Sequence, residues 1–367
     1  MKVLHIAPDY PHSKLYHQLI SSLEREGCKN SVYVQEEDAH LERNYPVFYL
    51  GRSFGVLDRL MFFRKQHIIK NDIIKHNLVD GVDVIHAHNL FSAGYNAMKL
   101  KRRYGIPYIV AIRNTDVNVF FHYMVHLRWM GVRIMKEADA IIFLSPAYRD
   151  NVIYTFVPLL SRGEILDKSY IIPNGLDPYF VDNIASQPKR LADKKCFRLI
   201  YVGDVDRNKN VRTTIKACEL LIKDGYSVSL DVVGRIKDKS QESIKDICFV
   251  NYHPYSPKEK VREYFKESDI FVMPSIHETF GLVYIEAMSQ GLPVIYSQGQ
   301  GFDGYYKEGK VGYHVPCFDE KAICDSVIRI ISNYTEMSET CIEAVKDFSW
   351  DKKAEEYKAI YMKVTKK

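Results

Sequence analysis

The stretch PSIHETFGLVYIEAMSQGLPVIYS, residues 274–297, contains the pattern that decides the fold. Its first residues end an apolar run, DIFVMPS, which is typical of a buried strand in a parallel sheet. An apolar-periodic helix is predicted over residues 282–290, because Gly291 suits a left-handed C-terminal cap and Pro293 prevents continuation. A second strand, LPVIYS, follows at once. Strand, helix and strand in this order predict a parallel α/β sheet.

The start of this predicted helix and a glutamate within it carry signals of ligand binding. Thr279, Phe280 and Gly281 precede it, where free backbone N–H groups and the positive end of the helix dipole favour a phosphate. Glu278 and Glu286 would be roughly 12 Å apart along a continuous helix, too far to share one proton or one metal ion. Two separated carboxylates suit the hydroxyls of two sugar rings with a diphosphate between them.

The alternation of strands and helices continues along the whole chain of 367 residues and falls into two series. The first series covers residues 1–178, the second covers residues 196–348, and the polar stretch 179–195 between them predicts an interdomain linker. Two α/β halves in one chain predict a ligand held in the cleft between them. The strands expected in the second series are FRLIYVGD, SVSLDVVG, ICFVNYHP, DIFVMPS, LPVIYS and VGYHVP.

Composition narrows the functional classes. With 46% hydrophobic and 26% charged residues the chain resembles a soluble globular protein, and a net charge of +5 spread over this length does not predict a nucleic-acid partner. Seven scattered cysteines without zinc-like spacing predict reduced thiols and a cytoplasmic location. The start, MKVLHIAPDY, lacks the long apolar core of a signal peptide, and no apolar run approaches the roughly 18 residues of a membrane span.

The two glutamates and their flanks, PS, ETFG, EAM and GLPV, resemble the E-x7-E signature of the retaining glycosyltransferases of family 4. The segments DVIHAHN, ADAIIFLSPAYRD, IIPNGLDPYF, LIYVGDVDRNKN and FSWDKKAEEYKAIYMKV resemble the corresponding segments of that family. The resemblance implies the α/β fold called GT-B, with two Rossmann-like parallel-sheet domains facing across a cleft. It also implies that a C-terminal helix over residues 350–365 crosses back to the N-terminal domain.

The same resemblance implies an activity. A hexosyl group would move with retention from a nucleoside diphosphate sugar, bound mainly by the C-terminal domain, to a saccharide acceptor held by the N-terminal domain. The favoured acceptor is lipid-linked, as in surface-polysaccharide or lipopolysaccharide assembly, with no cofactor and no obligatory metal ion. The implied donor-binding residues are Gly203, Arg207, Lys209, His253, Tyr255, Glu278, Thr279, Phe280, Gly281, Leu282 and Glu286. Among them Lys209 would contact the diphosphate, Glu278 the donor sugar and Glu286 the ribose. For His253 and Tyr255, contact with the nucleotide base and plain packing are equal alternatives.

The chain departs from the family's pattern around the diphosphate. Asp204 stands where relatives commonly have an arginine, so Arg207 is the candidate replacement. The first loop, residues 8–13, lacks the glycine pair of relatives, and Lys14 is a substitute candidate that equally suits a solvated helix surface.

A further departure lies in AIRNTDVNVFFHY, where Arg113 replaces a histidine, Asn114 replaces a glycine and Asp116 is retained. Arginine cannot act as a base at neutral pH, but it can hold a diphosphate or an anionic acceptor. The predicted catalytic set is therefore Glu278, Lys209, Arg113 and Asp116, with a turn or helix-cap role as the alternative for Asp116.

Three other interpretations stay open. His86 and His88 share one face of a strand and favour a structural role over acceptor contact or a metal site. Residues 124–136 place basic residues beside aromatic ones, which suits either a helix packed on the sheet or peripheral contact with the anionic inner face of a cell membrane. The whole chain could also be a sugar-nucleotide epimerase, or a non-catalytic donor-binding partner of another transferase.

Overall fold

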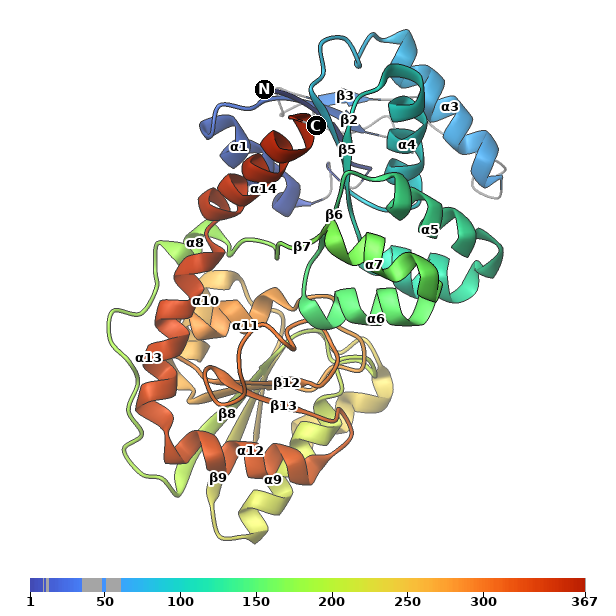
Figure 1. Ribbon diagram of the computed structural model, residues 1–367. Coiled ribbons are helices and arrows are strands. Elements are labelled where there is room, and N and C mark those ends of the chain that lie inside the picture. Colours follow the sequence, from blue (N-terminus) through green and yellow to red (C-terminus); the bar gives the residue numbers. More distant parts are fainter. Residues whose placement is uncertain (9, 11–12, 35–47, 51–60, 367) are drawn as a thin grey trace. The chain divides into compact units, whose positions relative to one another are not determined.

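The computed structural model describes residues 1–8, 10, 13–34, 48–50 and 61–366, and for 48–50 only the backbone (Figure 1). The chain divides into two compact units. The first contains Met1–Leu144, Arg149–Gly175 and the chain from Trp350 onward, and the second contains Ser145–Tyr148 and Leu176–Ser349. The stretch 179–195, which we predicted as a linker, falls within the second unit.

The first unit is built on a seven-stranded parallel sheet with the order β3-β2-β1-β4-β5-β6-β7. Every residue of β4, β5 and β6 is buried, as expected for strands covered on both faces. The order reverses between β1 and β4, the kind of position where doubly wound sheets bind ligands. The strands are β1 (Lys2–Ile6), β2 (Lys29–Val34), β3 (Phe48–Leu50), β4 (Val84–Ala87), β5 (Tyr108–Ala111), β6 (Ala140–Phe143) and β7 (Ser169–Ile171).

Helices α1 (Lys14–Arg25) and α14 (Trp350–Thr365) lie side by side on one face of this sheet (Figure 1). The buried side of α14 joins a core cluster with strand residues such as Val3 and Val84. The predicted return of the closing helix to the N-terminal part of the chain is thereby confirmed. The other helical segments are α3 (Phe62–Lys75), α4 (Ser92–Tyr104), η2 (Asp116–Phe121), η3 (Val125–Leu127), α5 (Arg128–Glu137), α6 (Pro146–Phe156) and α7 (Leu159–Asp167).

The second unit has a six-stranded parallel sheet with the order β10-β9-β8-β11-β12-β13. All six strands predicted for this part of the chain are present: β8 (Cys196–Val202), β9 (Ser227–Val233), β10 (Val250–His253), β11 (Ile270–Met273), β12 (Val294–Ser297) and β13 (Gly312–Val315). The helical segments are α8 (Pro178–Val181), α9 (Val211–Lys223), η4 (Lys239–Asp246), α10 (Lys258–Glu267), α11 (Leu282–Met288), α12 (Glu320–Ser332), α13 (Tyr334–Val345) and η5 (Lys346–Phe348).

The helix predicted between β11 and β12 is slightly shorter than expected. It begins at Leu282, as predicted, and ends at Met288 rather than at residue 290. Gly291 has the left-handed conformation that its position at the end of the helix requires, with φ 77°. Over the described part of the chain, no helix combines the length and apolarity needed to cross a membrane.

Candidate functional site

Two loops at the carboxyl ends of β8 and β11 bring together the predicted pair of Lys209 and Glu278. The Lys209 Nζ donates to Glu278 Oε2 at 2.6 Å, and both side chains keep some exposure, 26% and 13%. The Lys209 backbone N–H is held by Asp206 Oδ1 at 2.8 Å, which fixes the start of the lysine side chain. A lysine and a carboxylate from separate loops are therefore poised as one partly exposed ion pair.

Asn208 joins these two loops through hydrogen bonds that sequence reasoning did not find. Its carbonyl accepts from Ile276 N at 2.7 Å, its Oδ1 accepts from His277 N at 3.0 Å, and its Nδ2 donates to the His277 carbonyl at 3.1 Å. Asn210 adds a further bond from its Nδ2 to the Pro274 carbonyl at 3.0 Å. The sequence RNKN predicted diphosphate contacts for Lys209 and Arg207, but it gave no sign that its asparagines would bond to the partner loop.

The predicted phosphate-facing segment around Gly281 is tightly built. Gly281 has φ 82°, and a Cβ there would meet the Tyr284 ring at 2.4 Å, so the position requires glycine. The Phe280 side chain is buried among aromatic rings, which leaves only its backbone to face a ligand. Thr279 N donates to Glu278 Oε1 at 3.0 Å, so this carboxylate is oriented by its own backbone as well as by Lys209. Leu282, the first helical residue, is partly buried.

Glu286 lines a separate pocket of about 310 Å³ in the second unit. Burial, and after it the negative charge of Asp177, raises the pKa of Glu286 to about 7, while Lys258 acts in the opposite direction. Asp177 and Lys258 form an ion pair of 2.8 Å. The other lining residues are Phe180, Val202, Gly203, Asp204, Val233, Gly234, Tyr255, Ser256, Lys258 and Val261.

Two glycines permit a close backbone approach at this pocket. A Cβ on Gly234 would lie 1.9 Å from the Gly203 carbonyl oxygen, so the ends of β8 and β9 can meet only because residue 234 has no side chain. Tyr255, 64% exposed, stands at the pocket with the Arg235 guanidinium 4.4 Å from its ring centre. A flat ring backed by a cation offers a stacking surface for a planar ligand group.

The remaining predicted donor residues of this unit have varied surroundings. His253 lies 2.9 Å from the buried Asp231 and stacks on Tyr264 at 4.2 Å, so its ring is engaged within the unit. Asp204 forms an ion pair with Lys237 at 2.6 Å. Arg207, the candidate replacement for the arginine that relatives have at position 204, is exposed. Sequence reasoning missed four residues near the site, because each contributes to it only through a partner that the fold brings close. These residues are Asp177, Asp231, Arg235 and Lys258.

Arg113 and Asp116 meet in the first unit, in the loop after β5. The Arg113 Nε donates to the His88 carbonyl at 3.3 Å, and a terminal nitrogen donates to Asn174 Oδ1 at 3.4 Å. Asp116 is 1% exposed and accepts from three backbone N–H groups, those of Leu90 at 3.0 Å, Phe91 at 3.2 Å and Arg113 at 2.9 Å. Burial raises the pKa of Asp116 to about 6, and these three bonds oppose the rise.

The chain continues from Asp116 into η2, a π-helix, a form that often occurs at functional sites. Asp116 connects this segment to the loop that follows β4, while Arg113 keeps partial exposure. Asn114 beside them is exposed. The partly exposed Arg113 guanidinium can therefore contact a ligand, whereas the buried Asp116 carboxylate holds the loop in place.

His86 and His88 belong to a buried cluster with His5, a residue that the sequence did not single out. The three side chains offer nitrogen atoms within 4.8 Å of one another, but no carboxylate or thiol among the described residues joins the group to balance a metal charge. Burial lowers the pKa of His5 to about 4 and lowers the pKa of the other two well below the usual value. Neutral histidine rings that hydrogen-bond to Asn30 and Tyr361 fit the structural role predicted for this cluster better than a metal site.

The first loop is only partly described. Asp9, Pro11 and His12 lie outside the described residues. Tyr10 is buried in a small apolar cluster, with its ring 4.1 Å from that of His17. Lys14, the substitute candidate, is exposed at the start of α1.

Comparisons with known proteins agree with this architecture. The family model described as Glycosyltransferase Family 4 matches residues 13–180, and the model described as Glycosyl transferases group 1 matches residues 182–348. An alpha-monoglucosyldiacylglycerol synthase of Acholeplasma laidlawii is 26% identical over 69% of this chain and 67% of that protein.

Solved structures show the same fold. The lipopolysaccharide outer core galactosyltransferase WaaB, in its apo form, superposes with a TM-score of 0.76 at 15% identity, over 99% of each chain. HepE of Anabaena, in complex with UDP, superposes with a TM-score of 0.69 at 14% identity, over 99% of this chain and all of that one. Two Rossmann-like units of this kind define the GT-B fold. The chain belongs to the family 4, or group 1, glycosyltransferases.

Proposed function

We propose that the chain is a retaining, metal-independent hexosyltransferase that uses a nucleoside diphosphate sugar. The observation that carries this proposal is the 2.6 Å pair of Lys209 and Glu278, held at the strand ends of the second unit by the Asn208 bonds. A lysine suits a diphosphate and a carboxylate suits sugar hydroxyls, so a nucleotide sugar offers each of them a new partner. The UDP bound by the Anabaena relative of this fold makes UDP the first nucleotide to test.

In the proposed step, the bond between the anomeric carbon and the diphosphate oxygen breaks, and an acceptor hydroxyl oxygen bonds to that carbon on the same face. The hydroxyl proton passes to the departing diphosphate. Lys209 stabilises the charge that develops on this leaving group, which is the largest kind of contribution an enzyme makes to such a reaction. Glu278 orients the hexose, and the Glu286 pocket receives the ribose, with Tyr255 beside the base.

Arg113 has a different role in this proposal. Its guanidinium stays charged at every working pH, so it holds an anionic group of the substrates and does not remove a proton. Asp116 positions the loop that carries it, through the three backbone bonds.

We further propose a saccharide acceptor attached to a lipid, in surface-polysaccharide or lipopolysaccharide assembly. The names of two relatives support parts of this class: a monoglucosyldiacylglycerol synthase supports the lipid, and a lipopolysaccharide outer core galactosyltransferase supports a saccharide attached to a lipid.

The test is a panel of nucleoside diphosphate hexoses incubated with lipid-linked saccharides, with and without a chelator. The expected result is transfer that survives the chelator, from a donor with an axial anomeric bond to a product with the same configuration by NMR. Inversion of configuration contradicts the proposed mechanism. Conversion of the donor sugar without any acceptor identifies an epimerase, and binding without any turnover identifies a non-catalytic donor-binding protein.

A further inference from the structure

The positive charge of the chain is concentrated in one stretch of the first unit. Residues 99–168 contain eleven lysines and arginines against six acidic residues, whereas the rest of the chain has forty of each. This one stretch therefore carries the whole net charge of +5. A local surplus of this size attracts anionic partners, although the chain as a whole is close to neutral.

The same stretch contains eight of the fifteen large hydrophobic side chains that are exposed among the described residues. Leu160 is 99% exposed, Tyr123 79% and Leu159 75%. Single exposed apolar residues are ordinary, but a group of them rimmed by charges marks an interaction site. The eight are Tyr104, Val119, Tyr123, Val125, Trp129, Tyr154, Leu159 and Leu160.

The structure separates the buried and the exposed residues of this stretch. Phe121, Leu127 and Met130 are buried in the unit, whereas Tyr123 and Trp129 remain exposed. The helix-packing interpretation of residues 124–136 thus holds for one side of α5 only. The other side of the helix is exposed with its aromatic and basic side chains.

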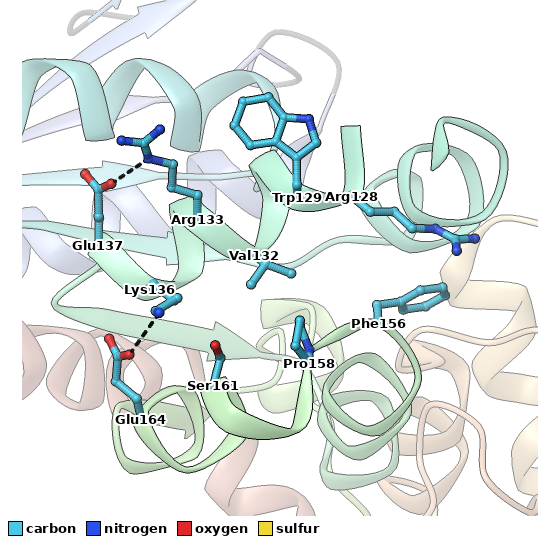
Figure 2. Close-up of a pocket in the computed structure, with 10 residues that line it drawn as sticks. All are labelled: Arg128, Trp129, Val132, Arg133, Lys136, Glu137, Phe156, Pro158, Ser161 and Glu164. Atoms are coloured by element: carbon cyan, nitrogen blue, oxygen red, sulfur yellow. Dashed lines mark hydrogen bonds and ion pairs between the residues drawn. The ribbon is translucent and has the colours of Figure 1, made fainter. Parts of the chain in front are cut away.

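A groove of about 750 Å³ lies between α5 and the segment leading into α7, as Figure 2 shows. Trp129 and Val132 come from α5, and Pro158 and Ser161 come from the opposite side. The groove is also lined by three basic residues, Arg128, Arg133 and Lys136, by two acidic ones, Glu137 and Glu164, and by Phe156. Arg133 contacts Glu137 at 3.1 Å and Lys136 contacts Glu164 at 3.8 Å, both at the surface, where such pairs exchange readily for other anions.

We propose that this surface docks on an anionic phospholipid bilayer. We call it the α5–α7 face and define it as Tyr123, Val125, Trp129, Arg133, Lys136, Tyr154, Leu159, Leu160 and Arg162. Leu159 and Leu160, at the first turn of α7, enter the acyl boundary, while the aromatic rings occupy the headgroup level. The cations attract the lipid phosphates before and after contact.

The composition of the face favours a bilayer over a protein partner. Residues 99–168 carry a surplus of five positive charges beside exposed aliphatic and aromatic side chains, and this combination suits an anionic lipid surface. Exposed aliphatic, aromatic and basic side chains are the kinds of residue that a membrane surface binds. The inference rests on the proposed function only in that a lipid-linked acceptor explains why the enzyme would dock there.

The test is cosedimentation of the full chain with vesicles, without any nucleotide sugar. Vesicles of phosphatidylcholine alone are compared with vesicles that also contain phosphatidylglycerol. We expect binding to the second kind only, weakened by added salt, because exposed charges are screened within about 10 Å at 0.1 M ionic strength.

Two double variants separate the contributions. Leu159→Ser with Leu160→Ser should weaken binding at least tenfold, since burial of even one leucine corresponds to a tenfold effect or more. Arg133→Gln with Lys136→Gln should weaken it about fivefold or more, because each basic residue near an anionic surface contributes roughly a factor of five. All four side chains are exposed, so the fold should tolerate the changes.

Matched controls lie in the second unit. Phe318→Ser removes a side chain that is 65% exposed, and Lys194→Gln with Lys195→Gln removes two exposed charges. Neither control should change vesicle binding.

Equal binding to both kinds of vesicle, or full binding by both double variants, overturns the proposal. Self-association that the leucine variant abolishes, without any vesicle binding, assigns the face to a second copy of the chain and also overturns it. Transfer to a soluble acceptor is measured separately. Failed docking with intact transfer refutes this inference alone, and docking without transfer refutes the proposed function alone.

Discussion

Each unit places a basic residue near a carboxylate at the ends of its parallel strands, but the two pairs are built differently. In the second unit Lys209 and Glu278 bond to each other through their side chains at 2.6 Å, and both are partly exposed. In the first unit the buried Asp116 accepts from three backbone N–H groups, and Arg113 directs its guanidinium to a carbonyl and an amide oxygen. A side-chain pair can exchange its partners for a ligand, whereas a carboxylate bonded to three backbone groups is part of the framework.

The largest expected effect is a loss of turnover on breaking the Lys209–Glu278 pair. Lys209→Ala should lower kcat by roughly a hundredfold to a thousandfold, as the loss of one stabilising donor does elsewhere, with a smaller rise in the donor KM. Steady-state kinetics with the best donor of the panel measures this. Lys237→Ala, which removes a more exposed lysine paired with Asp204, is the control and should retain most activity. A change confined to KM would mean that Lys209 only binds the donor.

The framework carboxylate should instead affect stability. Asp116→Ala leaves three backbone N–H groups without their acceptor, and we expect a loss of about 2–4 kcal/mol in the free energy of unfolding. Denaturant unfolding measures it, with the exposed Asp150→Ala as a control that should change stability by less than about 0.5 kcal/mol. An unfolding free energy equal to that of the wild type would remove the distinction between the two pairs.

Substitutions of Arg113 test whether its side chain contacts the substrates or only supports the loop structure. Arg113→Lys keeps the charge but loses the planar fork, so transfer should fall at least tenfold, as expected for a lost hydrogen bond to a charged group. Arg113→His should not restore it. Transfer rates are compared with thermal melts to exclude unfolding. Near wild-type transfer by the lysine variant would mean that Arg113 supplies only diffuse charge.

The smallest effect concerns Glu286. Because its pKa is raised to about 7, the carboxyl is mostly protonated below that pH and mostly ionised above it. Only the ionised form accepts two ribose hydrogen bonds, so nucleotide affinity should rise about tenfold from one unit below the pKa to one unit above it. Calorimetry at several pH values measures this. Glu286→Gln should bind more weakly and lose the pH dependence; an unchanged profile would assign the titration to another group.

Much of the fold was predictable from the sequence, because apolar runs and helix stops encode local structure. All six strands of the second unit and the position of Gly291 followed from such patterns. In the first unit β2, with its run KNSVYV, and helix α3 were not named in advance. A strand with a polar start and a helix with an irregular apolar pattern give weak periodic signals.

The candidate site was predictable as a set of residues and not as an arrangement. The pairing of Lys209 with Glu278 depends on two loops 69 residues apart, which Asn208 joins. The raised pKa of Glu286 depends on burial beside Asp177, a residue with no signal of its own. Partners distant in the sequence become visible only when the sheet brings the strand ends together.

The most direct test of the central claim is calorimetric titration of the chain with UDP and other nucleoside diphosphates, for the wild type, Lys209→Ala and the Lys209→Ala, Glu286→Gln double variant. The account predicts one nucleotide site, weaker in the single variant and weaker again, by a further several-fold to tenfold, in the double variant. Wild-type affinity in the double variant would contradict it, because the nucleotide would then bind somewhere other than the strand ends of the second unit.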